Sequence, residues 1–148
     1  MSGIARWWLR VNDGREEGSA VRYDEFLARV RERGEYADQQ EAERITRAVL
    51  GVLAGRLNPG EVKDLAAQLP RQAAAALAGA ASAEVFGVQE FLRRVAAATG
   101  ASEKTAEWDA SAVLCTVADA ISGGELNDVL TQLPSGYAVL FGKPTLSG

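Results

Sequence analysis

Two pairs of acidic residues have a spacing that could support metal binding or acid–base chemistry. Glu61 and Asp64 stand three residues apart, and so do Glu125 and Asp128. Residues at positions i and i+3 share one face of a helix, so each pair would present two carboxylates together. Four such carboxylates could hold a divalent cation or act as general acids and bases. Acidic residues in the first turn also stabilise a helix through its dipole, so a structural role is the alternative interpretation.

Both acidic pairs belong to a stretch that the chain contains twice. Residues 60–70, GEVKDLAAQLP, return as residues 124–134, GELNDVLTQLP, with Gly, Glu, Asp, Gln, Leu and Pro all displaced by 64 positions. Further upstream, EFLARV at 25–30 matches EFLRRV at 90–95 with a displacement of 65. We infer an internal duplication. Because one unit of about sixty residues would be only marginally stable alone, we expect the two units to pack together as one domain.

The hydrophobic spacing predicts about four helices in each unit. In unit one, residues 21–79, we expect helices over 23–33, from 38, from 58 to 70, and over 71–78. In unit two, residues 80–142, we expect them over 84–98, over 103–121, from 122, and around Tyr137, Leu140 and Phe141. Gly34 is predicted to end the first helix, and residues 143–148 to form a mobile tail. The predicted fold is a single all-α domain of two pseudo-repeated helical units.

Each acidic stretch opens with the pattern of a capping box. Asn58 and Glu61 form the first, and Ser122 and Glu125 form the second. In such a box the first side chain accepts a hydrogen bond from the fourth backbone N–H, and the glutamate reaches back to the first N–H. The cap changes from Asn to Ser while its chemistry is kept. We therefore expect a structural role for both glutamates.

Two glutamines, Gln68 and Gln132, precede Leu-Pro at matching positions. We expect each amide, placed at a helix end, to satisfy backbone groups of the next turn. The functional alternative is a polar contact with a peptide or a small ligand.

The composition removes several kinds of chemistry. The 148 residues include no histidine, which is the usual acid–base group near neutral pH and the commonest metal ligand. A single cysteine, Cys115, excludes an intramolecular disulfide and a thiolate metal cluster. We predict that Cys115 is a small buried hydrophobic residue. No phosphate-binding glycine motif occurs, so we expect no cofactor and no catalytic residues.

The charge distribution disfavours a nucleic-acid partner. Residues 1–79 contain twelve basic and twelve acidic side chains, and residues 80–148 contain four and eight, which gives the net charge of −4. Phosphate binding usually needs a basic excess, so we interpret Arg22, Arg29 and Arg33 as a solvated helix face. No apolar run could span a membrane and no signal-peptide core opens the chain, so we expect a cytoplasmic protein.

Tryptophans mark two surfaces that could bind a partner. Residues 1–20 form an N-terminal arm outside the duplication, with an apolar stripe at helical spacing formed by Ile4, Trp7, Trp8 and Val11. This stripe could cover the domain's own core, dock on a second subunit or another protein, or touch a membrane surface. Trp108 lies opposite the main apolar stripe of its helix, with Ala112 and Cys115 near it. That second face must pack between the units or against another chain.

Three elements carry a resemblance to a known family. They are YDEFLARV at 23–30, the pattern Glu43-x-x-x-x-Ala48-Val49-Leu50, and the doubled Gly-Glu-x-x-Asp-x-x-Gln-Leu-Pro. With these in order, residues 22–142 resemble the bacterial domain-of-unknown-function family 2267. The resemblance implies an all-helical fold of two similar halves and brings no established activity, cofactor or catalytic residue. Residues 1–20 look like an addition to the family pattern.

These observations leave two hypotheses about function. The leading one is a non-catalytic cytoplasmic interaction module that binds a protein partner or self-associates through the arm and the Trp108 face. The alternative is a small-molecule or divalent-cation binding protein, or an unusual enzyme. Its site would lie between the units, near Glu61, Asp64, Glu125 and Asp128.

Overall fold

The chain folds into helices joined by short turns. The computed structural model describes residues 22–78 and 84–143. The first half contains α2 (Tyr23–Gly34), α3 (Gln39–Arg56), α4 (Pro59–Ala66) and α5 (Arg71–Leu77). The second half contains α6 (Val88–Thr99), α7 (Glu103–Ala120), α8 (Gly123–Thr131) and a 3₁₀ helix, η1 (Ser135–Phe141). The described residues include no strand, which confirms the all-α prediction.

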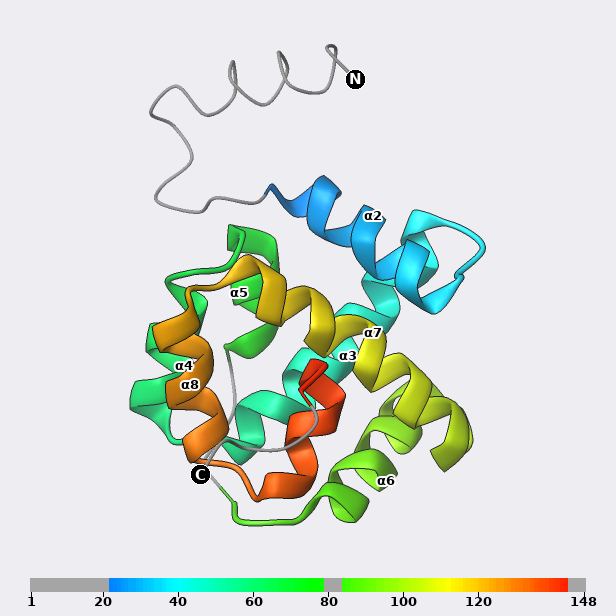
Figure 1. The fold of residues 1–148 in the computed structure, drawn as a ribbon. Coiled ribbons are helices and arrows are strands. Elements are labelled where there is room, and N and C mark those ends of the chain that lie inside the picture. The colour runs from blue at the N-terminus through cyan, green and yellow to red at the C-terminus, as the bar shows by residue number, and fades with distance from the viewer. Residues whose placement is uncertain (1–21, 79–83, 144–148) are drawn as a thin grey trace, which may run out of the picture.

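The two long helices, α3 and α7, lie at the centre and contact each other (Figure 1). Helix α2 packs on both of them, and so does α6. The first helix of each half therefore packs on the long helix of its own half and on that of the other. At one end of the molecule, α4 and α8 lie side by side.

The core is built from matching positions in the two halves. Phe26 and Val30 on α2 are fully buried, as are Phe91 and Val95 on α6. These are the positions that the helical spacing placed inward. One continuous cluster of buried hydrophobic side chains includes residues from both halves. Among the described residues, none of the helices combines the length and apolar character that crossing a bilayer requires.

Helix α6 begins at Val88, four residues later than predicted. The preceding backbone is held by side chains from elsewhere: Arg56 Nε donates a hydrogen bond to the carbonyl oxygen of Phe86 over 2.8 Å. The Tyr137 hydroxyl donates to the carbonyl oxygens of Phe86 and Gly87 over 2.9 and 3.2 Å. Because these carbonyls bond to side chains, the chain enters α6 in an extended conformation. The pattern of Phe86 and Phe91 could not reveal these contacts.

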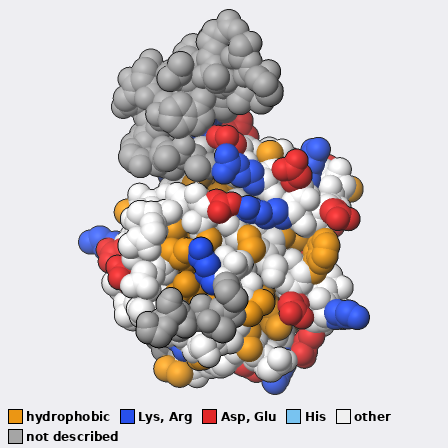
Figure 2. All heavy atoms as spheres, viewed as in Figure 1, with side chains coloured by type: hydrophobic (Ala, Val, Ile, Leu, Met, Phe, Trp, Pro, Cys, Tyr) orange, Lys and Arg blue, Asp and Glu red, His pale blue; other side chains and the backbone are white. Residues whose placement is uncertain are grey.

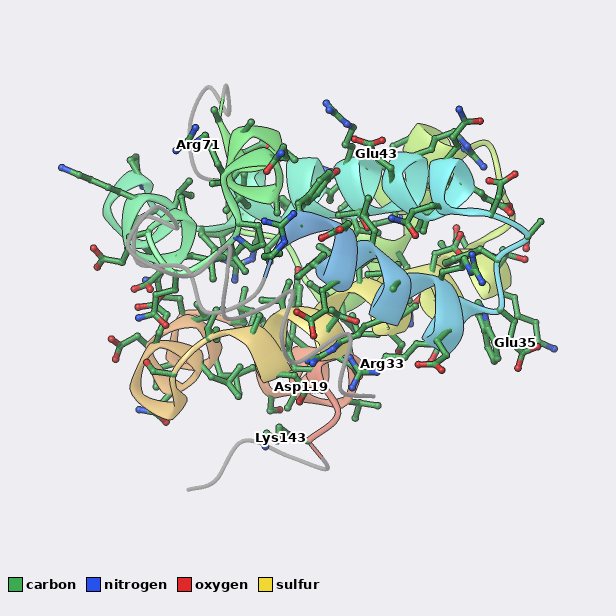
Figure 3. The ribbon with its side chains drawn as sticks, turned by 90° about the horizontal axis from the view of Figure 1, so that it is seen from above. Arg33, Glu35, Glu43, Arg71, Asp119 and Lys143 are labelled. Carbon is green, nitrogen blue, oxygen red and sulfur yellow. The ribbon has the colours of Figure 1, made fainter. Side chains whose placement is uncertain are left out.

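The end of α2 differs from the prediction in one residue. Gly34 belongs to the helix, and Glu35 takes the left-handed conformation, with φ of 57°. Gly34 is needed for space, because a Cβ atom there would lie 2.1 Å from Cε2 of Tyr36. At the matching end of α6, Gly100 takes the left-handed conformation with φ of 79°. Figure 3 shows Glu35 at the turn that leaves α2.

Helix α7 is covered on several sides by its own chain, since it contacts α2, α3, α6 and η1. Ala112, on the predicted second apolar face, is 4% exposed. Helices of the same chain thus cover this second face of α7, except at Trp108, which is half exposed.

Replacing Glu35 by glycine should stabilise the protein by about 1 kcal/mol, because an L residue in the left-handed region carries a steric cost that glycine avoids. The matched change Gly100→Ala should destabilise it by a similar amount. No atom lies within 4 Å of a Cβ built at Gly100, so this variant tests backbone conformation alone. Urea unfolding measures both free energies. Loss of stability in Glu35→Gly would contradict the assignment of strain to this turn.

Candidate functional site

The site lies where the first turns of α4 and α8 meet. The Asn58 side chain caps α4 by accepting a hydrogen bond from the Glu61 backbone N–H over 2.8 Å. The Ser122 hydroxyl caps α8 by accepting from the Glu125 backbone N–H over 3.0 Å. Both predicted caps are therefore present, and each places a glutamate in the first turn of its helix.

Two glutamines tie these helix starts together across the halves. The backbone N–H of Asn58 donates to Gln132 Oε1 over 3.3 Å, and that of Ser122 donates to Gln68 Oε1 over 2.8 Å. Each glutamine thus follows one short helix and binds the start of the other. The amides do bind backbone groups, as expected, but those of the short helix in the opposite half rather than those of the next turn.

Because Asn58 N–H and Ser122 N–H bind glutamines, the two glutamates do not complete their capping boxes. Instead their side chains are buried between α4 and α8: Glu61 is 8% exposed and Glu125 is 6% exposed. Gln132 Nε2 donates to Glu61 Oε1 over 3.0 Å. Both Oε2 atoms are buried and accept no hydrogen bond from a donor group among the described residues. The predicted structural role of the glutamates therefore does not take the form of a capping box.

A third carboxylate joins the buried pair. One oxygen each from Glu61, Glu125 and Asp128 lie within 4.8 Å of one another. Asp128 is exposed, and so is its counterpart Asp64. Two ligands on opposite sides of a Ca²⁺ ion lie about 4.6–5.2 Å apart, because each Ca²⁺–oxygen distance is about 2.3–2.6 Å. The structure therefore brings three of the four predicted carboxylates to a spacing that one cation could bridge.

The surroundings of Glu125 change the pKa of its carboxyl group. Burial, the hydrogen bond with Glu61 and the negative charges of Glu61, Asp64 and Asp128 raise the pKa of Glu125 to about 8. Two buried carboxylates side by side repel each other, so the arrangement favours either a proton or a cation between them. The site can therefore share a proton or coordinate a metal ion.

Of the residues predicted to bind a partner, Trp108 falls within the part of the chain that the structure describes. Ile4, Trp7, Trp8 and Val11 are outside the described residues. Trp108 on α7 is half exposed, and its indole N–H donates to the carbonyl oxygen of Gly34 over 2.9 Å. This bond fixes the ring against the end of α2.

Two arginines of α2, Arg29 and Arg33, pair with carboxylates. Arg29 pairs with Glu25 over 3.3 Å. Arg33 reaches α7, where it donates to Thr116 Oγ1 over 2.8 Å and also pairs with Asp119. Figure 3 shows Arg33 and Asp119 meeting where α2 crosses α7. Arg33 therefore joins the two halves.

Cys115 is half-buried, and its Sγ lies 3.5 Å from the carbonyl oxygen of Leu140. Burial raises the pKa of its thiol, which disfavours the reactive thiolate.

One buried polar contact was missed by the sequence reasoning. The Tyr36 hydroxyl donates to Asp109 Oδ1 over 2.5 Å, and Asp109 is 2% exposed. Burial raises the pKa of both groups, and the hydrogen bond favours the ionised form of Asp109. An aspartate inside the apolar helix α7 was the available signal. Its partner could not be found by periodicity, because Tyr36 lies in a turn.

Comparison with protein families gives a match over most of the chain. The family model described as "Uncharacterized conserved protein (DUF2267)" matches residues 23–140, which agrees with the resemblance seen in the sequence. No curated protein matches the chain.

The raised pKa predicts that stability falls as pH rises through neutrality in metal-free protein. The ordinary pKa of a glutamate is 4.5, so the folded state binds the Glu125 proton more tightly than the unfolded chain does. The contribution of Glu125 to the free energy of unfolding should therefore decrease between pH 4.5 and about 8 and stay level above that. Glu125→Gln should remove this decrease, as measured by thermal unfolding in the presence of a chelator. An identical pH dependence in both proteins would show that Glu125 keeps an ordinary pKa.

Proposed function

This chain belongs to the family of uncharacterized conserved proteins DUF2267, and we propose that it is a divalent-cation binding protein with its site between α4 and α8. The observation that carries this proposal is the buried pair of Glu61 and Glu125, whose Oε2 atoms have no donor among the described residues. Buried carboxylates are normally hydrogen-bonded or paired with a cation. A metal ion would supply the missing positive charge.

The ligand chemistry supports a hard cation. All three converging ligands are carboxylate oxygens, which suit Ca²⁺, Mg²⁺ and Mn²⁺ rather than softer metals. Mg²⁺ requires near-ideal octahedral geometry with oxygens at about 2.0–2.1 Å, whereas Ca²⁺ tolerates irregular geometry and longer distances. Ca²⁺ is therefore the probe of choice.

The hydrogen bonds at the starts of α4 and α8 also support a role in binding a cation rather than in catalysis. The glutamines already hold the helix starts through Asn58 N–H and Ser122 N–H, so the carboxylates are not needed as caps. Asp128 is exposed, so the third converging carboxylate reaches solvent next to the buried pair.

Adding Ca²⁺ to chelator-treated protein should raise its melting temperature. A ligand that binds only the folded state at a hundred times its dissociation constant contributes about 2.7 kcal/mol. Glu125→Gln should abolish this response, because it removes a ligand, while Glu107→Gln removes an exposed carboxylate on α7 and should respond like wild type. Scanning fluorimetry with Ca²⁺ and Mg²⁺ makes the comparison.

One result would overturn the proposal. If wild type does not respond to Ca²⁺, Mg²⁺ or Mn²⁺, and Glu125→Gln only raises stability near neutral pH, the pair serves as a proton-sharing contact between helices.

A specific observation also favours a second candidate, the interaction module. Trp108 is half exposed, and its bond to Gly34 holds the ring in one orientation. Tryptophans that need little ordering are frequent anchors of protein interfaces. On the face drawn in Figure 2, hydrophobic side chains gather among charged side chains of both signs. We propose self-association or partner binding through Trp108, with the N-terminal arm as a further contact.

Sedimentation velocity on the full chain tests self-association. Wild type should form a dimer as concentration rises, and Trp108→Ser should weaken it, since Trp108 is one of the large hydrophobic residues exposed in the described part of the chain. Val139→Ser, which removes an exposed apolar residue on η1, is the matched control. A monomer at every concentration in all three proteins would contradict self-association through Trp108.

A further inference from the structure

Arg56, at the end of α3, is a buried cation without an acidic partner. It is 7% exposed, and none of the carboxylates in the described part of the chain pairs with its guanidinium. Arg94, which lies against the same Phe86 ring, pairs with Glu84 over 2.6 Å and with Glu90 over 2.8 Å. Buried charges are normally paired, because removing an ion from water is costly. The fold therefore buries one positive charge that the described residues do not neutralise.

The contacts of Arg56 use one edge of its guanidinium and leave another edge open. Nε donates to the carbonyl oxygen of Phe86 over 2.8 Å, and Cζ lies 5.8 Å from the ring centroids of Phe86 and Tyr137. The remaining four N–H groups, on Nη1 and Nη2, have no carbonyl or carboxylate acceptor among the described residues. Neither Nη atom belongs to the fully buried nitrogens that lack a partner, so this edge reaches the surface. Its two parallel N–H groups match the two oxygens of an oxyanion.

A helix begins beside the buried arginine. The carbonyl that Nε binds belongs to Phe86, and α6 starts two residues later, with Gly87 as its N-cap and no side-chain hydrogen bond to its first N–H groups. Glu90, in the first turn, pairs instead with Arg93 and Arg94. A helix start carries a partial positive charge and free backbone N–H donors, which favour an anion. The uncapped start of α6 thus adds to the positive potential at this place.

The surrounding charges favour a ligand with a single negative charge. The two arginines of α6, Arg93 and Arg94, pair with two acidic residues, Glu84 and Glu90. These four charges cancel, so the charge of Arg56 remains as the local excess. A carboxylate would neutralise it, whereas a phosphate carries close to two negative charges near neutral pH and would be repelled by the nearby glutamates.

The architecture that the two halves share does not require this arginine. The position that matches Arg56 in the second half is Ala120, and the position that matches Tyr137 in the first half is Ala73, each displaced by 64 residues. The same places in the repeat are therefore filled without a charge or a ring. A buried charge that is present in one half alone is not explained by the packing common to both.

We infer that Arg56 and the uncapped start of α6 form a binding site for a small monocarboxylate, whose two oxygens accept hydrogen bonds from Nη1 and Nη2. The site is separate from the cation site between α4 and α8 and does not depend on it. Val85, which is 90% exposed, precedes Phe86 and offers an apolar contact for the remainder of the ligand.

NMR titration of the full chain with sodium acetate tests the inference. The Nε–Hε signal of Arg56 should shift in a saturable manner as acetate binds. The signal of Arg47, an exposed arginine of the same helix that pairs with Glu43, should not shift. Sodium chloride at the same ionic strength should leave both signals unchanged, and sodium phosphate should bind more weakly than acetate.

Variants of the two arginines add a second readout, the backbone amide signal of Gly87. Arg56→Lys keeps the charge and loses the planar fork, so acetate binding should weaken by about tenfold or more, because a hydrogen bond to a charged group contributes that much. Arg47→Gln should bind acetate like wild type. Circular dichroism confirms that each variant folds.

Three outcomes would overturn the inference. If acetate causes no saturable shift in wild type, the site does not exist, whether or not Arg56→Lys folds. Equal shifts with chloride would show that the arginine senses ionic strength alone. Tighter binding of phosphate than of acetate would overturn the assignment to a monocarboxylate. The Ca²⁺ response of the protein is measured separately and is not affected by any of these results.

Discussion

The fold depends on packing between the halves, because the first helix of each half contacts the long helices of both. Helix α2 packs on α3 and on α7, and α6 packs on α7 and on α3. Because each first helix is shared, neither half can bury its apolar residues completely without the other. The Arg33 contacts to Thr116 and Asp119 add a polar link along the same junction. This packing fixes the two long helices and thereby sets the place where α4 and α8 meet.

Where α4 and α8 meet, the fold buries two carboxyl groups side by side, those of Glu61 and Glu125. The glutamines bind the backbone N–H groups that would otherwise receive Glu61 and Glu125. The buried pair of Tyr36 and Asp109 shows the contrast, because that carboxylate has a hydroxyl donor at 2.5 Å. The glutamates have less compensation, and the nearby aspartates add further negative charge. Such a cluster favours a proton or a cation between the carboxylates, which is the physical basis of the proposed function.

Sequence reasoning found equivalent positions but not which of them are neighbours. The repeat and the helical spacing gave the all-α fold and the inward residues such as Phe26 and Phe91, because burial on one helix face leaves a periodic pattern. The four carboxylates were identified as a set for the same reason. That Gln68 and Gln132 cross between halves could not be predicted, since a repeat says nothing about how its copies face each other. The left-handed conformation of Glu35 was missed because a helix-ending glycine is normally the left-handed residue. Here Gly34 stays in the helix, where the Tyr36 ring leaves no room for a Cβ atom, and the left-handed position falls on Glu35.

The helix contacts between the halves also affect how the chain can fold during synthesis. Arg33 and its partner Thr116 are separated by 83 residues, and contacts of such separation slow folding. The first half leaves the ribosome while α6 and α7 are still unmade, so the faces of α2 and α3 that these helices cover stay open to solvent. Exposed apolar surface of this kind invites aggregation and chaperone binding in a nascent chain. These contacts between the halves therefore delay completion of the core until nearly the whole chain has been translated.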